Sequence, residues 1–132
     1  MPIDRAHVQD WLDRYVAAWR SYDAVTIGEL FSEDAEYYYH PYDTAPVRGR
    51  AAIIDDWLNP AGSADNRDAP GTWDATYAPY AVEGDRAVIV GRTDYRDGAG
   101  GPVVRTYENV WLLEFADRRC RKFVEYYMQE KR

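Results

Sequence analysis

Three charged side chains fall on strand faces that are otherwise apolar, and they are the first candidates for chemistry. Arg92 and Asp94 share one face of a predicted strand with Val88 and Val90, and Glu125 shares its face of the last strand with Phe123 and Tyr127. A buried charge without a partner is costly, so such groups should pair or take part in a reaction. The alternative is a solvated strand end, or a buried Arg–carboxylate pair that only supports the sheet.

Tyrosine is the unusual part of the composition, with 12 Tyr beside 5 Trp and 3 Phe. Each Tyr combines a large apolar ring with a hydroxyl that needs a partner. Successive strand residues alternate sides, so Tyr38, Tyr95 and Tyr126 are assigned to the opposite strand faces. One cavity is predicted for a larger polar and aromatic set, namely Tyr15, Tyr37, Tyr39, Tyr107, Asn109 and Tyr127.

Helices are predicted before strands. Val8, Trp11, Leu12 and Tyr15 follow the i, i+3, i+4, i+7 spacing of an amphipathic helix over residues 5–20, which Asp4 caps. A short helix is predicted over residues 24–31 and a third after residue 49, ending at 58. Residues 59–71 are turn formers, which predicts a mobile loop that could border a binding site.

The rest of the chain reads as strands. A first strand is predicted over residues 35–39, and four longer ones over 72–82, 86–95, 103–115 and 121–128. The turn segments that connect the four long strands have the lengths of hairpin loops, which favours an antiparallel meander. Helices followed by strands predict one α+β domain over residues 1–132, with the helices covering one face of a curved sheet.

Charge and cysteine content exclude several classes of protein. With 16 Lys+Arg against 23 Asp+Glu, the formal net charge of -7 argues against a nucleic-acid or anionic-membrane surface. No apolar run reaches the ~20 residues of a membrane-spanning helix, so we expect a cytoplasmic protein. The single Cys120 forms no internal disulfide, and its basic neighbours indicate a solvated turn.

Three segments carry a resemblance to a known family. They are RYVAAWRSYDAVTIGELFSEDA (14–35), HPYDTAPVRGRAAI (40–53) and the terminal FVEYYM (123–128). In them the chain resembles the SnoaL-like branch of the nuclear transport factor 2-like superfamily. The resemblance implies a cone-shaped fold, in which a bent sheet wraps around the first helix and leaves a deep, mostly apolar pocket. The fold hosts isomerases, hydrolases, cyclases and inert binding modules, so it does not fix the function.

Ketosteroid isomerases of this superfamily offer one set of roles. Such an enzyme needs a base and two hydrogen-bond donors for the developing enolate oxygen. The resemblance places the first donor at Tyr15 and the base at His40, whose imidazole could accept a proton near pH 7. Trp111 stands where the second donor, an Asp, is expected. His40 precedes Pro41 and could equally be an exposed histidine at a strand end.

Limonene-type epoxide hydrolases offer a second set of roles. Arg92-Thr93-Asp94 resembles their Arg-x-Asp, and Glu125 lies at the position of the second carboxylate. In that chemistry one carboxylate deprotonates water while the other donates a proton to the opening oxygen. Tyr37 falls on the family's Tyr, but Tyr39 replaces its Asn, and Glu replaces Asp at position 125.

These observations predict an enzyme without a cofactor or metal, acting on a small hydrophobic molecule by isomerase-, cyclase- or epoxide-hydrolase-like chemistry. The alternative is a non-catalytic binding or dimerisation domain, and we expect a homodimer through the outer sheet face. The predicted catalytic residues are Tyr15, His40, Arg92, Asp94 and Glu125. The predicted substrate-binding residues are Trp19, Tyr37, Tyr39, Trp57, Tyr107, Asn109, Trp111 and Tyr127.

Overall fold

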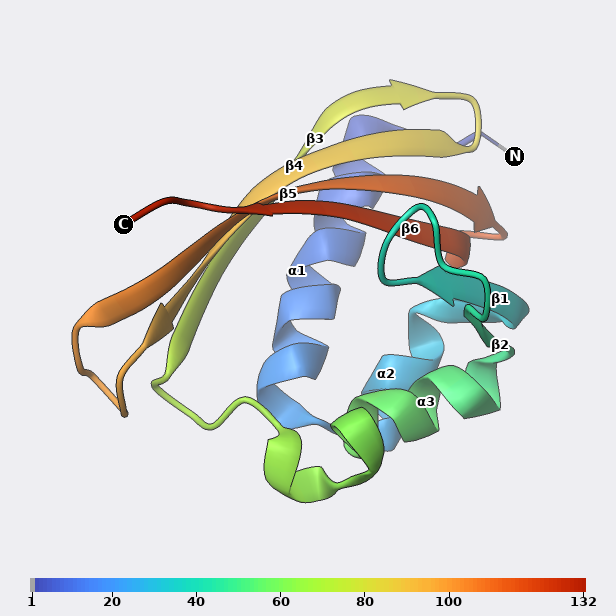
Figure 1. Cartoon of the computed structure of the whole chain (residues 1–132). Helices are drawn as coiled ribbons and strands as arrows, with labels where there is room; N and C mark the ends of the chain where they lie inside the picture. The colour runs from blue at the N-terminus through green and yellow to red at the C-terminus, as the bar shows by residue number, and fades with distance from the viewer. Residues whose placement is uncertain (1) are drawn as a thin grey trace.

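The computed structural model describes residues 2–132 as one curved six-stranded sheet with helices on its concave side (Figure 1). The helices are α1 (Arg5–Ser21), α2 (Ala24–Glu29) and α3 (Arg50–Leu58), followed by the short turns η1 (Pro60–Gly62) and η2 (Ala64–Asn66). This is the expected α+β architecture, and the sheet stays open rather than closing into a barrel. Within residues 2–132, none of the helices has the length and hydropathy of a membrane-spanning segment.

Helix α1 crosses the concave face of the sheet and packs through the predicted apolar stripe (Figure 1). Asp4 caps it by accepting a hydrogen bond from the backbone N–H of His7. Val8, Trp11 and Tyr15 are buried against the sheet. The helix ends at Tyr22, which adopts the left-handed conformation with φ of 50°. The prediction for residues 5–20 is therefore confirmed within one residue.

The sheet has the order β2-β1-β6-β5-β4-β3. Its long strands form the predicted antiparallel meander, with bounds β3 (Trp73–Glu83), β4 (Arg86–Arg96), β5 (Val103–Ala116) and β6 (Arg119–Gln129). The first strand, β1 (Phe31–Tyr38), starts earlier than predicted because it pairs in parallel with β6 from Phe31 onward. The two-residue strand β2 (Val47–Arg48) adds an edge that the sequence pattern did not indicate.

Alternation along β5 separates the core from the outer surface. Asn109, Trp111 and Leu113 point inward and are buried, whereas Val110 and Leu112 between them are exposed. The same parity puts Phe123 and Glu125 of β6 on the inner face. The core therefore lies between α1 and the inner face of β5 and β6.

Cys120 contradicts its prediction as part of a solvated basic turn. Its side chain is fully buried, and its thiol contacts the carbonyl of Lys122 at 3.3 Å. The basic residues beside it point to solvent, because neighbouring positions in a strand alternate sides. Burial raises the pKa of this thiol well above its usual value. Cys120 is thus a packing residue of the core.

Candidate functional site

A cavity of about 470 Å³ opens between α1, α3 and the inner face of the sheet. This volume suits a small molecule, since most ligand pockets measure about 300–1,000 Å³. Its walls are aromatic to an unusual degree, with Tyr15, Trp19, Tyr22, Tyr37, Tyr39, Trp57, Tyr77, Tyr95, Tyr107, Trp111 and Tyr127. Polar side chains are interspersed among these rings, namely Asp56, Asn66, Asp68, Thr93, Arg105, Asn109 and Glu125. The tyrosine surplus of the sequence is largely concentrated here.

Glu125 is a carboxyl group of the cavity lining, among the aromatic walls. It lies opposite Trp111 in the β5–β6 register, and the Trp111 Nε1–H donates a hydrogen bond to its Oε2 at 2.7 Å. No basic side chain within residues 2–132 forms an ion pair with it. Burial raises the pKa of Glu125 to about 7, although the Trp111 hydrogen bond lowers it in part. Glu125 can therefore gain or lose a proton near neutral pH.

Two hydroxyls from different elements meet beside Glu125. Tyr15 of α1 and Tyr37 of β1 share a hydrogen bond of 2.6 Å between their hydroxyl oxygens. Burial, with a contribution from the charge of Glu125, raises the pKa of both phenols well above the usual value. Both therefore stay protonated. One proton holds the pair together, and the other remains available to a ligand oxygen.

A second group of hydrogen-bonded polar side chains also lines the cavity. The Tyr77 hydroxyl of β3 is bonded to the Thr93 hydroxyl of β4 at 2.6 Å and accepts a hydrogen bond from the Asn109 amide at 2.7 Å. The Tyr77 ring stacks on Trp111 with 4.1 Å between ring centroids. This stack fixes the indole whose N–H holds Glu125. The wall thus positions the carboxylate indirectly.

The predicted turn-former segment borders the cavity through Asp68. Trp19 Nε1–H donates to Asp68 Oδ2 at 2.9 Å, and the backbone N–H of Asp68 donates to the Tyr22 hydroxyl at 2.9 Å. These bonds tie the segment to α1 and its C-terminal residue. Burial raises the pKa of Asp68.

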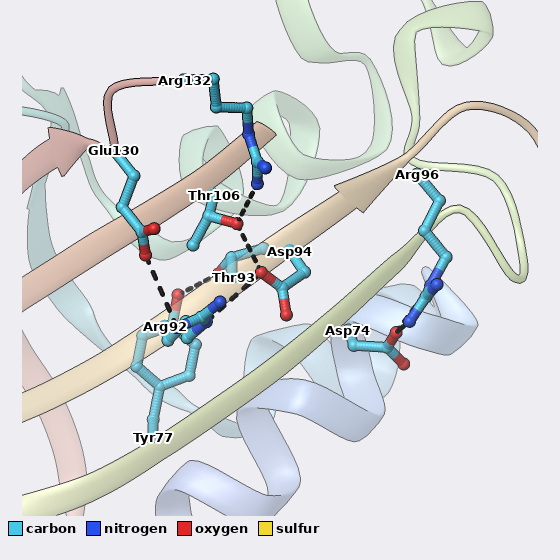
Figure 2. Close-up of polar contacts among 9 residues, drawn as sticks. All are labelled: Asp74, Tyr77, Arg92, Thr93, Asp94, Arg96, Thr106, Glu130 and Arg132. Carbon is cyan, nitrogen blue, oxygen red and sulfur yellow. Dashed lines mark hydrogen bonds and ion pairs between the residues drawn. The ribbon is translucent and has the colours of Figure 1, made fainter. Parts of the chain in front are cut away.

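Arg92 and Asp94 lie on the outer face of the sheet, away from the cavity, which corrects the prediction that they share it with Glu125 (Figure 2). The inner residues of β4 are Ala87, Ile89 and Thr93. Parity therefore turns the charged residues of this strand outward.

The outer-face pair belongs to a polar cluster with the C-terminal segment (Figure 2). Asp94 accepts hydrogen bonds from the Thr106 hydroxyl at 2.6 Å and from Arg92 Nε at 3.3 Å. Arg92 also pairs with Glu130 at 3.5 Å. The Thr106 hydrogen bond lowers the pKa of Asp94, and Arg92 adds to this effect. The Arg92 side chain is 54% exposed and that of Asp94 is 25% exposed, which agrees with the alternative of a solvated strand end and not with that of a buried Arg–carboxylate pair.

His40 also lies outside the cavity lining. It follows the end of β1 and stacks on Tyr42, with ring centroids 3.9 Å apart. Its prediction as the base of the cavity is therefore not supported by its position. The alternative prediction placed it at a strand end, and the structure agrees with that placement.

The structure brings the remaining predicted residues together. Tyr15 and Glu125 line the cavity, and so do all the predicted substrate-binding positions, Trp19, Tyr37, Tyr39, Trp57, Tyr107, Asn109, Trp111 and Tyr127. Tyr95 lines it too, although it was assigned to the opposite face by the wrong choice of parity on β4. The lining residues that the sequence interpretation missed include Tyr22, Asp56, Asp68, Tyr77, Thr93 and Arg105.

Some of these residues could have been found from the sequence. Thr93 and Tyr95 belong to the uncharged parity of β4, and a strand face without charges is the better candidate for the interior. Tyr77 could have been assigned to the interior in the same way, because it lies on the same face of β3 as Trp73. Nothing in the sequence marks Asp56, because it lies on α3 beside the equally acidic Asp55. Among residues 2–132, no cluster of three or more His, Cys, Asp or Glu could hold a metal ion.

Comparisons with known proteins agree with this architecture. A family model described as the SnoaL-like domain matches residues 12–123. No curated protein matches the chain significantly.

Solved structures share the fold at low sequence identity. A candidate ketosteroid isomerase from Kribbella flavida is 17% identical with a TM-score of 0.66, covering 98% of this chain and 83% of the other. A candidate SnoaL-like polyketide cyclase from Jannaschia sp. CCS1 is 14% identical with a TM-score of 0.65, covering 93% and 86%.

A nuclear transport factor 2-like protein of unknown function from Burkholderia xenovorans LB400 is 15% identical with a TM-score of 0.68, covering 96% and 87%. At these identities the likeness shows the fold alone. The domain match extends over most of the chain and agrees with the cone-shaped α+β fold. The protein therefore belongs to the SnoaL-like domain family, within the nuclear transport factor 2-like fold.

Proposed function

We propose that the protein is an enzyme that transfers protons on a small, largely apolar molecule held in the cavity, with Glu125 as general acid and base. The observation that carries this proposal is the position of Glu125. Its carboxyl faces an aromatic cavity, has no ion-pair partner within residues 2–132, and has its pKa raised to about 7 by burial. A general base works best when its pKa lies near the operating pH.

The geometry suits proton transfer next to a carbonyl group. The ionised Glu125 removes a proton from the carbon beside the carbonyl, and the electron pair moves onto the carbonyl oxygen. The free hydroxyl proton of the Tyr15–Tyr37 pair hydrogen-bonds this oxygen as its negative charge develops. Glu125 then returns the proton to the same or another carbon of the substrate, which gives exchange or isomerisation.

The positions of the predicted catalytic residues do not support epoxide hydrolysis. That chemistry requires a second carboxylate and an arginine beside the attacking water, and the candidates were Asp94 and Arg92. Both lie on the outer face and pair with each other there (Figure 2). The isomerase- and cyclase-like reading remains, and the solved structures that share the fold include candidates for both activities.

Exchange of carbon-bound protons tests this proposal without knowledge of the natural substrate. A panel of cyclic and aromatic ketones, including β,γ-unsaturated ones, is incubated in D₂O and followed by NMR for deuterium uptake and double-bond shift. The wild type should accelerate exchange of at least one ketone. Glu125→Gln should lower that rate by about 10²–10⁴-fold, since a positioned general base contributes this much.

Asp94→Asn is the matched control, because it removes one carboxylate from the outer face and leaves the cavity intact. It should exchange protons at the wild-type rate. Equal exchange rates in wild type and Glu125→Gln would overturn the proposal.

A non-catalytic binding module is the second candidate, and one observation favours it. The polar groups of the cavity largely satisfy one another, as in the Tyr77–Thr93–Asn109 group and the hydrogen bond from Tyr39 to Asp56. A panel in which no ketone exchanges faster than in buffer, alongside demonstrable ligand binding, would favour this candidate.

We also propose that the protein is a homodimer through the outer sheet face. Val90, Val110 and Tyr126 are direct cross-strand neighbours there, and they are 44%, 37% and 44% exposed. An apolar row of this kind, continued by Leu112 and Met128, is typical of protein–protein contact surfaces.

A further inference from the structure

The charges that line the cavity do not balance one another. Asp56, Asp68 and Glu125 all face it, yet none of the ion pairs formed within residues 2–132 includes any of the three. The paired carboxylates, such as Asp74 and Asp94, lie elsewhere. Carboxylates drawn out of water without a cation lose solvation that a ligand of opposite charge can restore.

The charge of Arg105, the single basic side chain of the lining, opposes the rise that burial causes in the pKa of Asp68, but Arg105 does not supply a cation to Glu125. Arg105 and Trp111 lie six positions apart along β5, which is about 20 Å of strand at ~3.3 Å per residue. The Arg105 guanidinium is exposed and lies over the Tyr95 ring, 4.8 Å from its centroid. It therefore occupies the far end of the cavity, and it shows that these tyrosine faces accept a cation.

The walls around Glu125 have the chemistry that binds organic cations. Tyr127 follows Glu125 by two residues on the same face of β6 and is 54% exposed, so much of its ring is open. Tyr39 is 39% exposed, and its hydroxyl donates to the Asp56 carboxylate. The Tyr107 and Tyr127 rings pack edge to face, with 75° between their planes and 5.9 Å between their centroids, so the two rings face in different directions. Aromatic faces in such an arrangement attract ammonium groups through their negative π-surface.

We propose that the cavity selects a molecule with a positively charged nitrogen, which lies between Glu125 and Asp56 against the open faces of Tyr39 and Tyr127. The apolar body of the molecule extends toward Trp111 and Tyr77. A metal ion fits less well, since hard cations prefer six or more oxygen ligands over aromatic faces. This inference rests on the proposed function, because it describes the substrate of the same cavity. The proposed function describes a small, largely apolar substrate, and this inference adds that the substrate carries a positive charge.

A matched pair of probes tests the inference. (4-Hydroxyphenyl)trimethylammonium and 4-tert-butylphenol have nearly the same shape and differ in one fixed positive charge. Both are titrated into the protein at pH 7.0 and 0.15 M salt, because at higher pH the ammonium group would promote ionisation of the phenol that carries it. Kd is measured from the indole N–H signals of the cavity tryptophans in NMR spectra. The cation should bind at least 10-fold more tightly than the neutral phenol.

Variants locate the source of this preference. Glu125→Gln should reduce the ratio of the two Kd values to below about 3-fold and leave the Kd of 4-tert-butylphenol within 2-fold of wild type. Asp56→Asn should reduce the ratio as well, and it serves if Glu125→Gln does not fold. Asp94→Asn removes the same charge from the outer face, so the ratio should stay at the wild-type value.

The inference is overturned if the neutral phenol binds as tightly as the cation, or if Asp94→Asn lowers the ratio as much as Glu125→Gln. Neither probe has a proton that the enzyme could exchange from carbon beside a carbonyl. If the protein binds the cation selectively but catalyses no exchange, the cation site is therefore supported and only the acid/base proposal is overturned.

Discussion

Glu125 links the stability of the protein to pH. Its pKa is about 7 in the folded protein and about 4.5 in the unfolded chain. The folded state therefore binds more protons than the unfolded state between these values, and stability is lost as the pH rises through this window. Below it the carboxyl is protonated in both states and makes no such contribution.

Glu125→Gln should remove this pH-dependent loss, because glutamine keeps the shape and does not ionise. The variant should be more stable than wild type by ~1 kcal/mol at pH 5 and ~3 kcal/mol at pH 8. These values follow from the rise of the carboxyl pKa from 4.5 to about 7 on folding. Urea unfolding at the two pH values measures the difference. A difference that is the same at both pH values would contradict the buried, titrating carboxyl.

Trp111→Phe should raise the pKa of Glu125 further. The Trp111 indole N–H stabilises the charged carboxylate at 2.7 Å, and phenylalanine offers no donor at that position. The carboxyl carbon of Glu125, followed by ¹³C NMR as a function of pH, should titrate at a higher midpoint in the variant. Trp57→Phe is a suitable control, because Trp57 lines the same cavity but has no such bond to Glu125. A midpoint that fell in Trp111→Phe would contradict this reading of the hydrogen bond.

At the residue scale, sequence reasoning succeeded where strand parity and aromatic content agreed. Asn109, Trp111 and Glu125 were placed on inner faces, and each lines the cavity. It failed for Arg92 and Asp94, since a charged pair on a strand face with valines fits an outer face as well as an inner one. The Arg-x-Asp string resembled a catalytic motif, but the hydrogen bonds of Asp94 hold it on the other side of the sheet.

At the scale of elements, Gly91 makes room for one wall of the cavity. A Cβ at this position of β4 would stand 1.8 Å from the Tyr77 ring, and that ring is fixed by Thr93 and Asn109. A strand glycine that packs under an aromatic ring is a site of close approach.

Gly91→Ala should therefore lower the free energy of unfolding by ~1–3 kcal/mol, as overpacked core positions do. It should also displace Tyr77 from the cavity wall. In a Tyr77→Ala background the clash is absent, so the same change should cost less than ~0.5 kcal/mol. Urea unfolding of the four proteins completes this double-mutant cycle. An equal cost in both backgrounds would contradict the contact.

The elements themselves followed from periodicity more closely than their ends did. The apolar stripe of α1 and the hairpin spacing of β3 to β6 predicted those elements within a residue or two. The start of β1 and the whole of β2 depend on pairing between distant parts of the chain, Phe31 with Cys120 and Glu36 with Arg48. Local sequence carries no signal for such tertiary pairing.

At the scale of the whole molecule, the proposed homodimer through the outer sheet face can be tested by mass. A homodimer should have twice the chain mass of 15.3 kDa in sedimentation equilibrium. Val110→Arg places a charge in the centre of the exposed apolar row and should give a monomer. Val25→Arg is the matched control, because Val25 is 69% exposed on α2 at a distance from that face. A monomeric wild type would contradict the proposed dimer.

A ¹³C NMR titration of the Glu125 carboxyl in the wild-type protein is the direct test of Glu125 as the acid and base of the cavity, and Glu125→Gln assigns its signal. We expect a midpoint near pH 7, because burial among aromatic rings without a basic partner disfavours the charged form. A midpoint below pH 5, close to that of an exposed glutamate, would contradict it. The carboxylate would then be ionised at all neutral pH values and could not serve as the acid of the proposed proton transfer.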